Sequence, residues 1–253
     1  MIKHKKNILK FGLSIIVLVG FLAAANPVIS PLDFDLNTFL GTRQFSQNVM
    51  LLISLAMISL LPFFLIATTS FLRTVIILGF IRSAVGTQQT PPSAVIISIA
   101  IFMTVFIMTP VWTEISTTAI EPYNKGLITQ KTAIDRGLVP LKKFMLMQTR
   151  EKDIMLFVQF SKIPPLKKIE DVPMYVLMPA FMISELKTAF QISFVIFLPF
   201  VVIDLIVANV LLSLGMFMLS PVMVSLPFKI LMFVLADGWF LITQGIMQSF
   251  IYR

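Results

Sequence analysis

The chain has 253 residues, of which 57% are hydrophobic and 13% are charged. Soluble domains carry about 25% charged residues, so this composition excludes a disordered chain and indicates a membrane or membrane-associated protein. The absence of cysteine and the single histidine, His4, exclude disulfides, thiolate metal sites and an H-E-x-x-H zinc site. The net charge is +8, but four lysines before residue 11 supply half of it, so we expect no nucleic-acid partner.

The first 25 residues have the order of a secretory signal peptide. Residues 1–10 are basic, residues 11–22 are apolar, and Ala23-Ala24-Ala25 supplies an A-x-A cleavage pattern. The apolar run is shorter than the ~20 residues of a membrane span. We therefore predict a signal peptide over residues 1–25 that is cleaved after Ala25, with an uncleaved first anchor as the alternative.

Residues 26–112 are predicted to form an outer segment and the first helical hairpin. Residues 49–67 carry no charge and are long enough for a membrane span or a fully buried helix. The next apolar stretch, residues 68–85, holds Arg73 and Arg82. Because an arginine at the centre of a lipid bilayer costs about 2.5–3.5 kcal/mol, we expect both to face protein, headgroups or a wet cavity.

A sharp break is predicted after this stretch. Gly86 suits the carboxyl-terminal cap of a helix, and Pro91 and Pro92 prevent the helix from continuing. We expect Ser93 to cap the helix that follows, which runs over the uncharged residues 94–112.

Residues 113–190 are predicted to form a polar helical insert, whose basic excess does not fix its side of the membrane; the periplasmic side is what the family resemblance described below implies. The spacing of apolar residues among charges indicates helix over residues 129–160. Glu114 and Glu121 are seven residues apart, but Pro122 follows directly. We interpret these two residues as solvated carboxylates rather than as a catalytic pair.

Residues 191–253 are predicted to form a carboxyl-terminal helical hairpin with a methionine-rich loop. Residues 192–224 contain one charge, Asp204, and are too many for one span, so we expect a break near Gly215 and Pro221. A second apolar stretch then follows, interrupted by Lys229 and Asp237-Gly238.

Two features of this hairpin have open interpretations. An ionisable group inside an apolar helix suggests a function, so Asp204 is either a proton or ion site or a structural partner of Arg73, Arg82 or the backbone. Methionine is flexible and re-packs around changing surfaces. The run Met216-Phe217-Met218 is therefore either a plug for a pore formed by several copies or apolar filler in a turn.

The sequence therefore predicts an all-α fold of membrane-integral or assembly-embedded hairpins. About four hydrophobic segments are expected, with the polar insert between the second and the third. The chain has no G-x-x-x-x-G-K, G-x-S-x-G or G-x-G-x-x-G motif. We expect no catalytic residue, no cofactor and no metal site.

Several sequence blocks resemble one known family. The match covers about residues 45–250, and the blocks include Gly86-Thr87-Gln88-Gln89-Thr90-Pro91-Pro92, Gln148-Thr149-Arg150-Glu151-Lys152-Asp153, Ser184-Glu185-Leu186-Lys187 and Asp237-Gly238-Trp239. The chain resembles the FliP family of flagellar biosynthetic proteins, which has a counterpart in virulence type III secretion injectisomes. The signal-like leader and the block over residues 149–153 look more flagellar, and the injectisome subunit remains the alternative.

This resemblance implies a non-enzymatic core subunit of the flagellar type III protein-export gate. Family members form a homo-oligomer of about five copies with two partner proteins, Q and R, alongside the export-apparatus membrane proteins A and B. The assembly passes unfolded flagellar proteins across the bacterial inner membrane at the flagellar basal body. Family members are multi-pass by hydropathy, but much of the assembly lies on the periplasmic side.

The resemblance also implies roles for individual residues. Phe144, Phe157 and Glu185 match positions associated with subunit contacts in the ring. Met216, Phe217 and Met218 match the gasket that seals the closed pore, with Phe217 in place of the usual central methionine. Arg73, Arg82 and Asp204 would be buried structural charges. A secondary transporter or ion channel that uses Asp204 is the more remote alternative.

Overall fold

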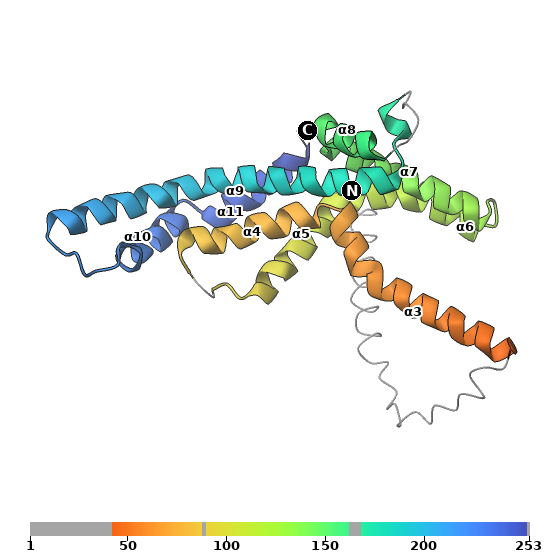
Figure 1. The fold of residues 1–253 in the computed structure, drawn as a ribbon, viewed down its shortest axis with the longest axis horizontal. Coiled ribbons are helices and arrows are strands. Elements are labelled where there is room, and N and C mark those ends of the chain that lie inside the picture. The colour runs from red at the N-terminus through yellow and green to blue at the C-terminus, as the bar shows by residue number, and fades with distance from the viewer. Residues whose placement is uncertain (1–41, 88–89, 162–167, 252–253) are drawn as a thin grey trace, which may run out of the picture. The chain divides into compact units, whose positions relative to one another are not determined.

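The second half of the chain is built around one long helix (Figure 1). The computed structural model describes residues 42–87, 90–161 and 168–251, and every regular element in these ranges is a helix, which confirms the all-α prediction. Contacts divide the chain into two compact units, residues 1–59 and 60–253. The predicted signal peptide, residues 1–25, lies outside the described ranges.

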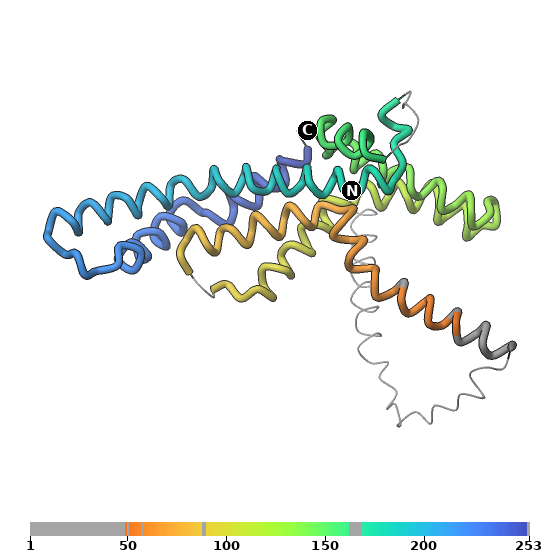
Figure 2. Tube along the Cα trace, viewed as in Figure 1, coloured from red at the N-terminus to blue at the C-terminus, as the bar shows by residue number. Residues whose placement is uncertain are grey.

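Figure 2 traces the helices in chain order. Their bounds are α3 (Thr42–Thr68), α4 (Phe71–Val85), α5 (Ser93–Ile115), the π-helix η1 (Ser116–Ile120), α6 (Glu121–Asn124), α7 (Gln130–Gln148), α8 (Glu151–Phe160), the 3₁₀-helix η2 (Ile169–Asp171), α9 (Met174–Ser213), α10 (Pro221–Leu235) and α11 (Gly238–Ile251).

The break after α4 lies where it was predicted. Gly86 caps α4 in the left-handed conformation, at φ +86°, which glycine adopts without a steric cost. The predicted capping role of Ser93 is wrong. Pro92 is extended and precedes α5, so Ser93 is the first helical residue. Its hydroxyl instead accepts a hydrogen bond from Arg82 at 3.0 Å.

The predicted helix over residues 129–160 is present as two helices. α7 and α8 are separated by Thr149 and Arg150, which are extended. Thr129 caps α7 by accepting a hydrogen bond from the backbone amide of Thr132 at 3.4 Å. In the middle of α7, Gly137 faces η1, where a Cβ would make an ordinary van der Waals contact with the Ala119 side chain at 3.6 Å.

α9 is the helix on which the unit of residues 60–253 is built. Its 40 residues span about 60 Å, twice the ~30 Å thickness of a bilayer's hydrocarbon core. It runs without a break through residue 190, where the polar insert was predicted to end. Its first half packs on α4, α7 and α8, and its second half packs on α10.

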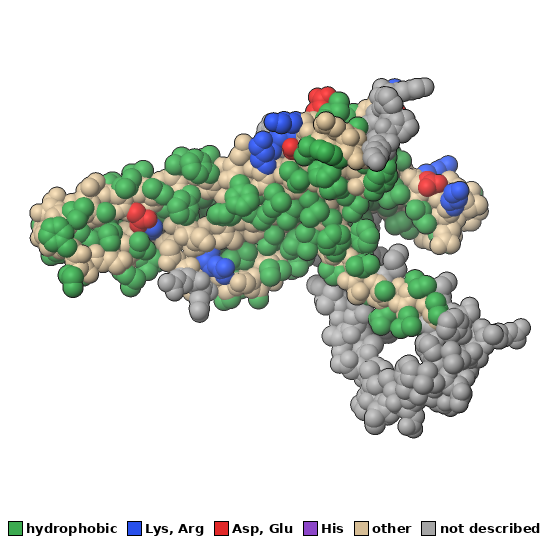
Figure 3. Space-filling model, in the orientation of Figure 1, with side chains coloured by type: hydrophobic (Ala, Val, Ile, Leu, Met, Phe, Trp, Pro, Cys, Tyr) green, Lys and Arg blue, Asp and Glu red, His purple; other side chains and the backbone are tan. Residues whose placement is uncertain are grey.

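Among the residues that the structure describes, three helical segments are long and apolar enough to cross a membrane, by length and composition: Leu51–Thr68, Ser93–Asn124 and Met174–Ser213. α10 and α11 would together form a fourth if the bent pair counts as one span. Only 11% of the apolar window of α9 is buried within the chain. Hydrophobic side chains accordingly cover much of the visible surface along α9 and α10 (Figure 3). This surface is suited to lipid or to other protein chains.

The connection between α10 and α11 is a tight bend at Asp237 and Gly238. Asp237 is left-handed, at φ +49°, and the two helices diverge by 64°. A Cβ on Gly238 would lie 2.4 Å from the ring of Phe233. That ring also makes a T-shaped contact with Trp239, with 5.3 Å between the ring centroids. The bend therefore requires glycine at this position.

We expect Gly238→Ala to lower the stability of the chain by about 1–3 kcal/mol, because the Phe233 ring must move out of its packed position. Thermal unfolding of the purified chain in detergent, followed by tryptophan fluorescence, measures the effect. Gly245→Ala is the matched control on the same helix, since a Cβ there meets nothing within 4 Å. Equal melting temperatures for the two variants would contradict the expectation.

Candidate functional site

The loop between α9 and α10, residues 214–220, presents three large apolar side chains away from the chain. Met216, Phe217 and Met218 are 46%, 76% and 99% exposed. Gly215 is left-handed at φ +72°, and the amide of Met216 donates to the carbonyl of Leu211 at 2.9 Å, which closes the end of α9. The break that was predicted near Gly215 and Pro221 is therefore confirmed.

The chemistry of this loop suits contact rather than catalysis. None of its side chains before Ser220 carries a polar group. Because apolar side chains of this size are unfavourably exposed to water, covering them with another surface lowers the free energy. The two methionines adapt to the shape of such a surface, whereas the ring of Phe217 is stiffer.

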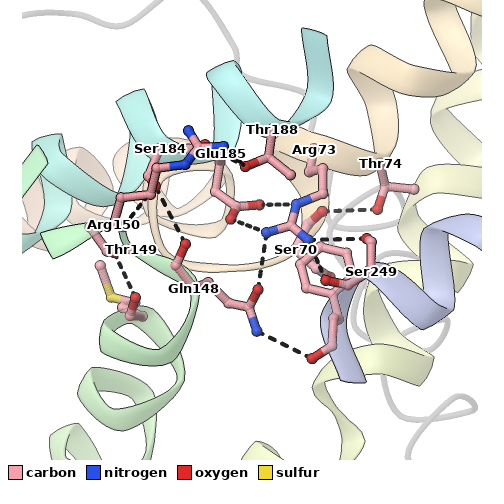
Figure 4. Close-up of polar contacts among 12 residues, drawn as sticks. Ser70, Arg73, Thr74, Gln148, Thr149, Arg150, Ser184, Glu185, Thr188 and Ser249 are labelled. Atoms are coloured by element: carbon pink, nitrogen blue, oxygen red, sulfur yellow. Dashed lines mark hydrogen bonds and ion pairs between the residues drawn. The ribbon is translucent and has the colours of Figure 1, made fainter. Parts of the chain in front are cut away.

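Arg73 forms the centre of a buried polar network that joins four helices (Figure 4). Its side chain is fully buried, as is that of Glu185 on α9. The guanidinium binds the carboxylate with two hydrogen bonds: Nε donates to Oε2 at 2.7 Å, and Nη2 donates to Oε1. Two parallel charge-assisted bonds give this pair a fixed geometry.

The Nη1 group of Arg73 reaches the end of α11. Nη1 donates to the backbone carbonyl of Ser249 at 2.9 Å and to its hydroxyl at 3.0 Å. The guanidinium carbon lies 3.8 Å from the centroid of the Phe250 ring. A cation at this place satisfies a carbonyl in the last turn of the helix and is favoured by the helix dipole.

Gln148, the last residue of α7, completes the network. Its side-chain oxygen accepts from Nη2 of Arg73 at 3.0 Å, and its side-chain nitrogen donates to the carbonyl of Phe250 at 3.2 Å. Ser184, beside Glu185, accepts from the backbone amide of Arg150 at 2.9 Å. The start of α8 is thereby tied to the same turn of α9.

The residues that the resemblance assigns to subunit contacts all pack within a single chain. Phe144 is partly buried, with its ring centroid 6.2 Å from that of Phe181 and 6.3 Å from that of Phe250. Phe157 is partly buried against the apolar cluster beneath α7 and α8. Glu185 is the fully buried partner of Arg73. The structure brings Phe144 and Glu185 to the end of α11.

Asp204 pairs with Lys229 across the carboxyl-terminal hairpin, and not with Arg73 or Arg82. Nζ of Lys229 lies 2.6 Å from Oδ2 of Asp204, and the Ser225 hydroxyl donates to Oδ1. The lysine side chain is 4% exposed and that of the aspartate 29%. Arg82 is only partly buried, in the last turn of α4, where the helix dipole favours a cation.

The sequence reasoning did not predict the partners in these networks, among them Lys229 and Gln148. Lys229 could have been found, because Asp204 and Lys229 lie thirteen residues before and twelve residues after Phe217, opposite each other in an antiparallel hairpin. Gln148 carries no charge and had no such signal. Within the described ranges, no three Asp, Glu, His or Cys side chains are placed to hold a metal ion.

Comparison with known proteins agrees with the family resemblance seen in the sequence. A model of the FliP family matches residues 54–246. "Flagellar biosynthetic protein FliP" of Bacillus subtilis (strain 168) is 48% identical over 205 residues, which cover 81% of this chain and 93% of that protein. The protein of the same name from Caulobacter vibrioides is 42% identical over 252 residues, 99% of this chain and 95% of that protein. On this evidence, the chain belongs to the FliP family.

Proposed function

We propose that this chain is a membrane subunit of the flagellar protein-export gate and that it has no catalytic role. Family membership and the flagellar names of its relatives support the apparatus. The observation that carries the gate role is the loop of Met216, Phe217 and Met218, which lies exposed between two long apolar helices. The flagellar names also favour this apparatus over a virulence injectisome.

In this proposal several copies, about five, surround a channel together with the partner proteins Q and R. The apolar surface of α9 supports such an assembly. Exposed residues along its second half include Phe194, Val202, Leu205 and Val210. A surface of this kind is covered in the working state, either by neighbouring subunits or by the lipid of the inner membrane. The export proteins A and B would lie around this core.

The loop would seal the channel when no substrate is present. If the copies converge at one end, their methionine and phenylalanine side chains meet on the axis and exclude water and ions. An unfolded flagellar protein in transit would push these side chains apart, and the flexible thioethers would re-pack around it. The site therefore needs neither a nucleophile nor a metal.

An ion-coupled transporter is the weaker proposal. A coupling site needs a carboxylate that can exchange its proton or ion, whereas Asp204 holds Lys229 and Ser225. These contacts support a structural role, in which the pair joins α9 to α10 near the loop of residues 214–220.

Native mass spectrometry of the purified full chain tests the proposal. We expect a ring of about five copies that captures the Q and R proteins when all three are co-expressed. A monomer or dimer that fails to bind either protein would overturn the export-gate assignment. Asp204→Asn is the informative variant: a structural role predicts a lower ring yield, whereas a coupling role predicts intact rings.

A further inference from the structure

The position of Glu185 inside the chain bears on how it acts in the assembly. Its side chain has no exposed surface in a single chain. A neighbouring subunit could reach this carboxylate only if the chain opened. An effect of Glu185 on a ring therefore has to pass through the groups that it contacts, and the foremost of these is Arg73.

The Arg73 network fixes the end of α11 and with it the outward face of that helix. Ile242, Ile246 and Phe250 form the buried stripe of α11. Phe240 and Leu241 are exposed, at 60% and 54%. The carbonyls of Ser249 and Phe250 accept from Arg73 and Gln148 in the last turn, so that turn can neither rotate nor lift away while the network holds.

We propose that Glu185 is a positioning residue: it holds Arg73, which with Gln148 pins the end of α11, so that α11 presents its exposed face to a neighbouring subunit in one orientation. The ring itself rests on the proposed function, but the pinning of α11 is a property of the single chain. Loss of the carboxylate leaves a buried guanidinium without its counter-charge, and the structure relieves this by releasing α11 and admitting water.

Thiol labelling measures the position of α11 directly. The chain has no cysteine, so Ile246→Cys places a single thiol on the buried stripe. Leu177→Cys is the reference, because Leu177 is equally buried in the cluster beneath α7 and α8. In the purified full chain, we expect Glu185→Gln to raise the labelling rate of the thiol at 246 by about a hundredfold and to leave that at 177 unchanged.

Either of two labelling results would overturn the proposal. No change at position 246 would mean that Glu185 does not hold α11. Equal increases at both positions would mean that the variant unfolds as a whole and that the effect is not local to α11. Neither result requires a ring to form, so they test the pinning of α11 independently of the export-gate assignment.

Moving the carboxylate from position 185 to position 148 tests whether Glu185 acts inside the chain or contacts a neighbouring subunit directly. Arg73 bonds both Glu185 and Gln148 through Nη2, so the double variant Glu185→Gln/Gln148→Glu restores a carboxylate beside the same guanidinium. We expect the double variant to recover protection of the thiol at 246 and ring yield above either single variant. The recovery is partial, because the carbonyl of Phe250 loses its donor. A ring yield no better than that of Glu185→Gln, with the thiol at 246 protected again, would assign Glu185 to the subunit contact itself.

Discussion

Replacement of Met216, Phe217 and Met218 by glycine should leave the ring assembled and make the closed gate leak small ions. The three side chains are exposed, and none belongs to the two buried apolar clusters that the described residues form. Their removal therefore costs the single chain little stability, but it empties the place where the copies would converge. Glycine also removes the apolar surface that excludes water from the axis.

Ion flux in cells or in vesicles that contain the whole gate, with ring yield measured in parallel, checks this expectation. Leu127→Gly is the matched control, because Leu127 is 72% exposed in the turn between α6 and α7, far along the chain from residues 214–220. If a fully assembled triple-glycine gate did not leak ions, the loop would not form the seal. Phe217→Met should keep the seal and, by adding flexibility, ease the passage of a bulky chain.

Arg73→Met should destabilise the chain by about 3–5 kcal/mol, the largest effect that we expect from a single substitution. It leaves the Glu185 carboxylate buried without a counter-charge, and it removes the donors to Ser249 and Gln148. Since an apolar pair of similar volume avoids the desolvation of both charges, Arg73→Met/Glu185→Leu should be more stable than Arg73→Met alone.

Thermal unfolding in detergent measures these differences. Arg82→Met is the matched control on the same helix: Arg82 is only partly buried and bonds Ser93 near the surface, so its loss should cost less than about 1 kcal/mol. If the Arg73→Met and Arg82→Met variants had equal melting temperatures, the buried network would not be a main source of stability. If the double variant had the same melting temperature as Arg73→Met, the lost hydrogen bonds to α11 would contribute more to the destabilisation than the unpaired charge.

The sequence was sufficient to place the elements wherever a local signal exists. The break at Gly86 and the prolines, the turn near Gly215 and Pro221, and the helices over residues 129–160 all follow from backbone geometry and from apolar spacing. The capping role of Ser93 failed because Pro92 fixes where the chain enters the helix. A cap depends on one residue's backbone angles, which the pattern does not specify.

By itself the sequence determined the class of the protein: an all-helical, apolar chain whose blocks place it in one family and whose loop holds Met216, Phe217 and Met218. Only the tertiary structure decided which charges meet. Arg73 pairs with Glu185, which lies 112 positions later in the chain, and Asp204 pairs with Lys229 rather than with an arginine. Helical periodicity is local and fixes which residues share a face. A buried charge, however, takes as its partner whatever the packing of distant helices brings within reach, because an unpaired charge in an apolar interior is too unfavourable to persist.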